Sequence, residues 1–249
     1  MESGRILRNS QIIILGVCIA AATIVSSVIL SRGFLKVIKF TREQITVTGS
    51  AQRSIKSDYI MWSGVFSRRD ADLSTAYKAL QDDLAKVQTY LRSRGVNEKE
   101  IIVSQISTTT VYKKNEKGHD TNDIQGYLLS QNVDIRSGDV DKITQVSRES
   151  TELIKQGVEF VSGAPEYTYT KLDELKIEML ANASENAKER AASMVKATGN
   201  TIGFMRSARM GVFQITPLHS TEVSDWGVND TTSLEKKVTA VVSASFAIE

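Results

Sequence analysis

The sequence contains little cysteine and histidine and almost no excess of charge of either sign. Cys18 is the only cysteine, so it cannot form a disulfide within the chain, and a dithiol redox mechanism within one chain is excluded. The 31 basic and 29 acidic residues leave a formal net charge of +2, which gives no electrostatic case for nucleic-acid binding. The hydrophobic share of 41% and the charged share of 24% are those of a globular chain that can bury a core.

The sequence also lacks the motifs of several enzyme and cofactor classes. It has no Walker loop and no G-x-G-x-x-G, so nucleotide binding has no phosphate cradle, and without G-x-S-x-G the serines near His219 form no recognisable triad. His119 and His219 lie in polar segments without a second histidine or cysteine at metal-ligand spacing. The adjacent acids Asp82 and Asp83 are expected to point to different sides of one helix into solvent. We therefore expect no catalytic residue, no cofactor and no metal.

One long uncharged segment is present near the start of the chain. Residues 12–30, IIILGVCIAAATIVSSVIL, contain no charge, and as a helix they would extend about 28 Å, enough to cross a bilayer core. No A-x-A-like cleavage site follows them, so we predict an uncleaved transmembrane anchor. It separates an N-terminal tail (1–11) from a juxtamembrane linker (31–43).

The charges around this segment leave its orientation open. Two arginines precede the apolar run and four basic residues follow it, so the positive-inside rule taken alone places the C-terminal domain in the cytoplasm. Long C-terminal domains are nevertheless translocated after a positively charged first segment. Residues 34–40, FLKVIKF, fit either a position at the lipid headgroups or a first strand.

Beyond the linker, two periodicities alternate and predict an α+β fold. Three helices are expected. The first begins at Leu73, with Asp72 as its N-cap and Gly95 just after its end, and the second covers residues 140–156. The third begins near Thr170, its capping residue, and ends at Gly199. Alternation of apolar and polar residues predicts strands at 45–52, 58–67, 101–112, 127–135, 158–163, 166–170, 204–215 and 238–248, with a polar hairpin tip at 113–123. We expect residues 44–249 to form one domain, an antiparallel sheet with long amphipathic helices packed on one face.

Two features of this domain are candidate interaction surfaces. The last helix carries an apolar stripe from Leu172 to Met194 that includes Ala183, Ala187 and Ala191, and such small residues allow close approach either to the sheet or to a partner. Trp226 lies in the polar segment SDWGVND, where it is expected either to anchor a partner or to fold back onto the domain.

Four segments in a fixed order resemble the SIMPL-domain family. They are ITVTGSAQ (45–52), LIKQGVEFVSG (153–163), NAKERAASMVKATGNTIG (186–203) and KVTAVVSASFAI (237–248). The resemblance, to a bacterial member, covers about residues 44 to 249, although SIKSDYI lacks the proline that many members have after the first strand. It implies an α+β fold, an exported or membrane-anchored location, oligomers in some members, a link to envelope stress and no established catalytic residues. The founding animal protein of the family is a signalling adapter that associates with a pelle-like kinase.

The sequence and this resemblance together favour a membrane-anchored, non-enzymatic interaction or assembly domain of the cell envelope. We expect it to form homo-oligomers and to lie outside the cytoplasm, attached to the cytoplasmic membrane by its N-terminal helix. The alternative is a small-molecule or lipid-binding protein with a pocket between helices and sheet. An enzyme is the third hypothesis.

Overall fold

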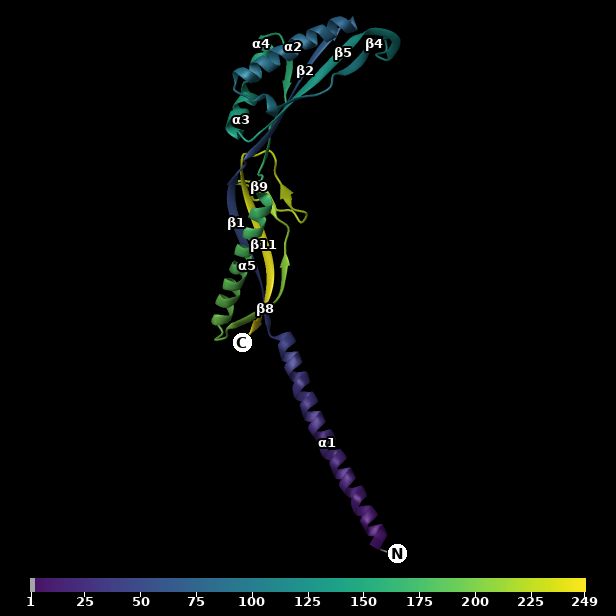
Figure 1. The fold of residues 1–249 in the computed structure, drawn as a ribbon, viewed down its shortest axis with the longest axis vertical. Helices are drawn as coiled ribbons and strands as arrows, with labels where there is room; N and C mark the ends of the chain where they lie inside the picture. The colour runs from purple at the N-terminus through teal and green to yellow at the C-terminus, as the bar shows by residue number, and fades with distance from the viewer. Residues whose placement is uncertain (1–2) are drawn as a thin grey trace. The chain divides into compact units, whose positions relative to one another are not determined.

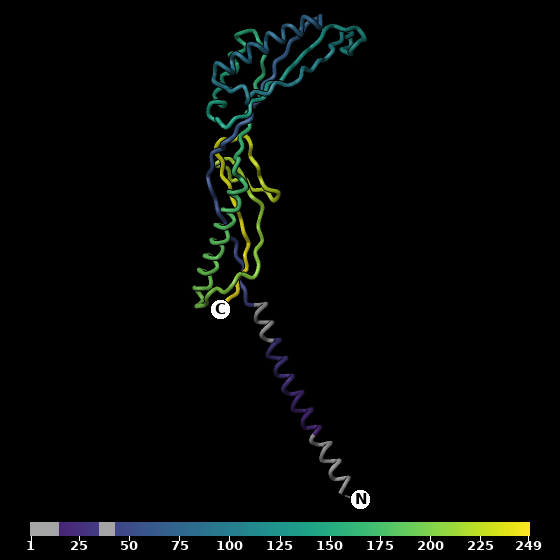
Figure 2. The backbone as a smooth tube through the Cα atoms, in the orientation of Figure 1, coloured from purple at the N-terminus to yellow at the C-terminus, as the bar shows by residue number. Residues whose placement is uncertain are grey.

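A computed structural model of the chain describes the backbone of residues 3–249 and the side chains of residues 15–34 and 43–249 (Figure 2). Its first element is the helix α1 (Ser3–Arg42), within which Leu15–Phe34 is long and apolar enough to cross a membrane. A signal sequence passes the same test of length and composition. The predicted apolar helix is confirmed, whereas a first strand at residues 34–40 is wrong because α1 continues to Arg42.

The remainder of the chain is α+β, as predicted, and divides into two compact units. One unit contains residues 1–50, 180–211 and 241–249, and the other contains residues 51–179 and 212–240. Three long elements contribute residues to both units, namely β1 (Gln44–Lys56), α5 (Leu172–Lys196) and β11 (Glu235–Ile248).

The first unit is built on β11, which pairs with β1 on one side and with β8 (Ile202–Met210) on the other. The β8–β11 ladder is antiparallel, with Val242 opposite Met210 and Ala244 opposite Ala208. Val238, Ala240, Val242 and Ala244 are buried in alternation, as predicted, but the alternation ends there, because Ser245 and Ala247 are buried as well as Phe246. Figure 1 shows α5 running beside β1 and β11.

The second unit has a sheet centred on β2 (Tyr59–Asp70) and β5 (Asp120–Ser137), which pair antiparallel along eleven residue pairs from Ile60↔Ser137 to Asp70↔Tyr127. The other strands of this sheet are β3 (Ile101–Val103) and β4 (Ser107–Lys114) beside β5, and β6 (Glu159–Ser162) and β7 (Glu166–Thr168) beside β2. The predicted strand at 101–112 is thus interrupted, because Ser104 leaves the β3 ladder and its hydroxyl accepts from Asn132 N–H. Two short strands, β9 (Gln214–Pro217) and β10 (Val228–Asn229), pair in parallel.

The helices of the second unit cover this sheet. They are α2 (Leu73–Ser93), α3 (Val140–Glu149), α4 (Glu152–Lys155) and the 3₁₀ turn η1 (Glu98–Glu100), and Figure 1 shows α2 lying along β2 and β5. The core consists of large apolar side chains from both layers: Ile60, Trp62, Phe66, Leu80, Val87, Leu91, Leu129, Val133, Ile135, Ile143 and Leu153.

Several local signals of the sequence act as predicted. The Asp72 carboxylate accepts the Thr75 N–H at 2.8 Å and so caps α2, because the first N–H groups of a helix have no partner within it. Gly95 and Gly199 adopt left-handed φ angles of 73° and 80° just after α2 and α5, a conformation that costs glycine little.

Other local predictions are wrong. The Thr170 hydroxyl donates to Asp58 Oδ2 at 2.8 Å and does not cap α5, which begins at Leu172. The helix predicted over 140–156 is divided into α3 and α4 by residues 150 and 151. At the end of the α5 stripe, Met194 is 58% exposed and Val195 is buried, because the step of four residues from Ala191 leads to Val195.

Candidate functional site

The alanine stripe of α5 packs inside the first unit. Ala183, Ala187 and Ala191 are fully buried. A Cβ atom on Gly49 of β1 would lie 2.2 Å from the carbonyl oxygen of Ala183 and 2.4 Å from the backbone nitrogen of Ala187, so only glycine fits beneath the helix. Asn186 and Arg190 continue the contact, since Asn186 Oδ1 accepts the Ser50 N–H and Arg190 Nη1 donates to the Thr48 carbonyl. Close packing within the chain therefore accounts for the three alanines.

Trp226 is presented to solvent by the loop that joins β9 to β10. Its side chain is 93% exposed, and that of Val223 in the same loop is 78% exposed. Glu222 and Asp225 beside them are also exposed. A tryptophan exposed to this extent is the feature of this segment that requires an explanation, because large apolar side chains in water favour association.

The backbone of this loop is held by the buried side chain of Gln214 on β9. Gln214 Nε2 donates to the Ser224 carbonyl at 2.7 Å, and Gln214 Oε1 accepts the N–H groups of Val228 at 3.0 Å and of Ser224 at 3.3 Å. A single amide thus binds the loop on both sides of Trp226. The turn after Trp226 is completed by Gly227, which has φ of 86° and donates its N–H to the Ser224 carbonyl. Backbone hydrogen bonds therefore fix the tip while its apolar side chains stay exposed.

Of two lysines on β11, Lys237 binds the loop itself, and Lys236 binds β7 and the segment after β10. Lys237 Nζ donates to the Ser220 carbonyl at 2.8 Å. Lys236, only 2% exposed, donates from Nζ to the carbonyl of Tyr167 at 3.0 Å and to the carbonyl of Asp230. Its Nζ also lies 3.9 Å from Asp230 Oδ2. Burial lowers the pKa of Lys236, and the negative charge of Asp230 opposes that shift only in part.

Asp230 completes this buried cluster. Burial acts to raise the pKa of Asp230, but hydrogen bonds from the hydroxyl and N–H of Thr232, a bond from Ser233 and the charge of Lys236 lower it overall. Asp230 Oδ2 is buried and accepts no hydrogen bond from the described protein groups. The cluster joins β7, the segment after β10 and β11, so its first role is to hold these segments together.

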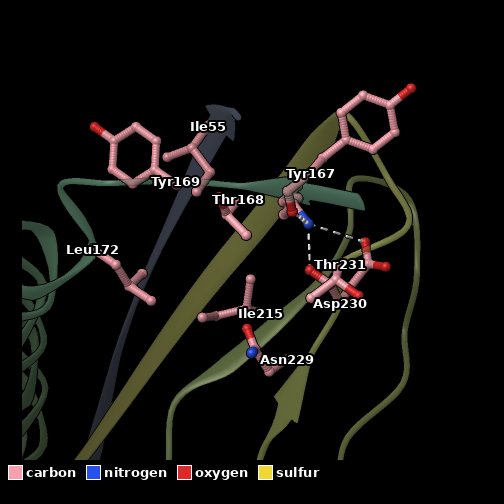
Figure 3. A pocket seen from close by; sticks show the side chains of 10 residues that line it. Ile55, Tyr167, Thr168, Tyr169, Leu172, Ile215, Asn229, Asp230 and Thr231 are labelled. Carbon is pink, nitrogen blue, oxygen red and sulfur yellow. Dashed lines mark hydrogen bonds and ion pairs between the residues drawn. The ribbon is translucent and has the colours of Figure 1, made fainter. Parts of the chain in front are cut away.

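A small cavity lies beside Lys236 and Asp230 (Figure 3). Its volume is about 110 Å³. Drug-sized ligands occupy pockets of roughly 300–1,000 Å³, so this space is too small for a lipid chain or a large metabolite. The cavity is lined by Ile55, Tyr167, Thr168, Tyr169, Leu172, Ile215, Asn229, Asp230, Thr231 and Lys236, all from the second unit.

Asp82 and Asp83, the adjacent acids of α2, have different surroundings. Asp82 is exposed as predicted, but Asp83 is fully buried, which corrects the expectation that both acids are solvated. The Asp83 carboxylate pairs with Arg68 of β2 through two hydrogen bonds, one of them of 2.7 Å from Arg68 Nη2. Arg68 Nη2 also donates to the Gly157 carbonyl, so this pair connects α2, β2 and the end of α4.

The residues that the structure describes contain no cluster of three or more histidine, cysteine or acidic side chains able to hold a metal. His119 and His219 are exposed and lie in separate segments, the first at the tip of the β4–β5 hairpin and the second at the start of the Trp226 loop. The exposed loop that carries Trp226 is the candidate site.

Sequence reasoning identified Trp226 and the alanine stripe but missed Gly49, Gln214 and Lys236. Gly49 lies inside the predicted strand ITVTGSAQ, and a glycine within a strand pattern is a signal of close backbone approach. Gln214 and Lys236 carry no comparable signal, because a polar residue at the start of a strand is ordinarily exposed.

Comparison with known families agrees with the resemblance found in the sequence. The model of the SIMPL family, described as a protein of unknown function (DUF541), matches residues 45–246. No protein of curated function matches the chain significantly.

Proposed function

This chain belongs to the SIMPL family, and from that premise we propose that it is a membrane-anchored, non-enzymatic interaction and assembly module of the cell envelope. In this proposal α1 is the anchor, the α+β region lies outside the cytoplasm, and a role in envelope stress follows from the family resemblance. The region binds a protein partner and associates with identical copies.

The observation that carries the proposal is the ordered exposure of Trp226. An exposed side chain on a mobile loop would pay a conformational cost on binding, whereas the hydrogen bonds of Gln214 and Lys237 fix the backbone of this loop before the partner arrives. Tryptophan is also enriched among the side chains that dominate binding energy at protein interfaces. Val223 enlarges the apolar contact.

Association of identical copies is supported by the strand β8. Among the described strands β8 pairs with β11 alone, so its second edge is open. Met205 and Met210 on β8 are about half exposed. An open edge with apolar side chains is a common template for pairing between chains.

Photo-crosslinking from the loop tests the proposal in the full chain within its membrane. A photoreactive phenylalanine analogue is placed at position 226, and the matched control carries it at Thr221, an exposed residue of the same loop. We expect position 226 to give a discrete protein adduct and position 221 to give much less. Absence of any protein adduct from position 226 would exclude the loop as a binding surface.

A second candidate function is the binding of a small ligand, favoured by the cavity beside Lys236 and by the buried acceptor Asp230 Oδ2. Its volume of about 110 Å³ restricts a ligand to a few heavy atoms that include a hydrogen-bond donor. Native mass spectrometry of protein purified from its host should then detect a small bound mass that Asp230→Asn abolishes. Identical masses for both proteins would dismiss this candidate.

A further inference from the structure

A groove on the β4–β5 hairpin has the size and the chemistry to receive an aromatic side chain. It has a volume of about 560 Å³ and lies within the second unit. Tyr112, 41% exposed, supplies an aromatic face, while Arg69 and Lys114 supply cations. The threonines 109 and 110 of β4 contribute hydroxyl and methyl groups to its wall.

The local backbone explains why a groove forms at this place. The β4–β5 ladder shifts register between Val111 and Tyr112 and again between Tyr112 and Lys114. Gly126 of β5, opposite Val111, is packed so tightly that a Cβ atom would lie 2.6 Å from the Asp70 carbonyl oxygen. Bulges of this kind redirect side chains and are frequent beside functional sites. Tyr112 and Lys114, which lie at these shifts, both line the groove.

The charges of this groove complement those of the Trp226 loop. Arg69 and Lys114 outweigh the single acid Asp120 among the groove residues, so the lining carries a net charge of +1, and the tip of the loop carries Glu222 and Asp225. Cations are attracted to the face of an indole ring, and aromatic pairs such as tryptophan with tyrosine attract each other further. An acidic loop with a central tryptophan is therefore the kind of ligand that this groove fits.

We propose that the Trp226 loop of one copy docks into the β4–β5 groove of a second copy of this chain. The inference rests on the proposed function, because it names the partner that the loop binds. At 93% exposure Trp226 does not occupy the groove of its own chain, so both surfaces are available on every copy. Anchoring in one membrane raises the local concentration of copies, which favours contacts between them.

The contact is heterologous, since loop and groove are different surfaces. Each copy can give its loop to one neighbour and receive the loop of another. Such contacts close into rings when the rotation between copies allows it and otherwise extend into open chains. The interface thus connects more than two copies without a second type of contact.

The experiment uses the full chain in its membrane with the photoreactive residue at position 226. We expect an adduct of twice the mass of the chain, with the crosslinked peptide within residues 107–127 or containing Arg69. Asp225→Lys should lower the yield about threefold, and Lys114→Glu in the same chain should restore it, because the exchanged charges attract again. Lys117→Glu, an exposed charge reversal at the hairpin tip outside the groove, serves as the control and should not restore the yield.

The outcomes separate this inference from the function on which it rests. A doubled mass crosslinked neither within residues 107–127 nor at Arg69, or a yield that Lys114→Glu does not restore, overturns the groove as the receptor. An adduct with another protein overturns the second copy as partner and leaves the interaction function standing. An adduct with lipid alone, or none, overturns both.

Discussion

Single residues decide how closely the layers of the first unit approach. Gly49 allows the backbone of α5 to rest on β1, and the alanines at 183, 187 and 191 supply the matching flat surface. The sequence indicated close packing from the alanines alone. The partner surface had to come from the structure, because one glycine in a strand does not say which helix covers it.

Gly49→Ala should therefore destabilise the fold by about 1–3 kcal/mol, the usual cost of forcing extra atoms into a packed core. The new methyl group would meet backbone atoms of Ala183 and Ala187, which cannot rotate away as a side chain could. The midpoint of urea unfolding measures the effect. Thr48→Ala, an exposed change on the same strand, is the control and should alter stability by less than about 0.5 kcal/mol. Equal midpoints for the two variants would contradict the packing described.

Asp230 should make stability depend on acid pH. Its pKa in the folded chain is lowered from 3.8, so its carboxylate stabilises the fold above that value, and the stabilisation is lost as the pH falls through the lower folded pKa. Urea midpoints between pH 2 and pH 6 should fall at the acid end less steeply for Asp230→Asn than for the natural chain. Parallel curves would mean that Asp230 is equally easy to protonate when folded and unfolded.

Periodicity located most helices and strands, because burial of one face imposes a repeat of two or of 3.6 residues. The ends of α2 and α5 were also predictable from Asp72, Gly95 and Gly199, whose effects are local. The interruptions within 101–112, 140–156 and 204–215 were not. Two of them coincide with bonds to residues distant in sequence, from Asn132 to Ser104 and from Gly211 to Val241.

The loop between β9 and β10 owes its order to Gln214, so changing this residue should release the loop without disturbing the strands. Gln214→Ala removes the partners of three backbone groups of Ser224 and Val228. We expect faster amide hydrogen exchange at Ser224 and Val228 and a lower crosslinking yield from position 226. Gln214→Glu keeps the acceptor and loses the donor, so its exchange rates and crosslinking yield should fall between those of the natural chain and those of Gln214→Ala. Unchanged exchange in Gln214→Ala would show that other contacts order the loop.

At the scale of the whole molecule, the sequence was sufficient for the family, the α+β class and the apolar N-terminal helix. The family follows from the order of the motifs, the α+β class from the periodicities, and the helix from a long run of apolar residues. The division of the chain into two compact units was not predicted, because β1, α5 and β11 continue from one unit into the other without a break in pattern. Trp226 was named as a candidate from sequence, but whether its side chain faced solvent or the core depended on how Gln214 holds the loop.

The central claim is that the exposed tryptophan holds a partner, and the mass of the particles formed by the full chain tests it most directly. The chain is extracted with its surrounding lipid, and single-particle masses are compared for the natural sequence and Trp226→Ala over a series of concentrations. We predict particles that contain more than one protein chain for the natural sequence, and an association weakened about 30-fold, or about 2 kcal/mol, in the variant. Single chains without a partner in both samples, or identical assemblies in both, would contradict the account.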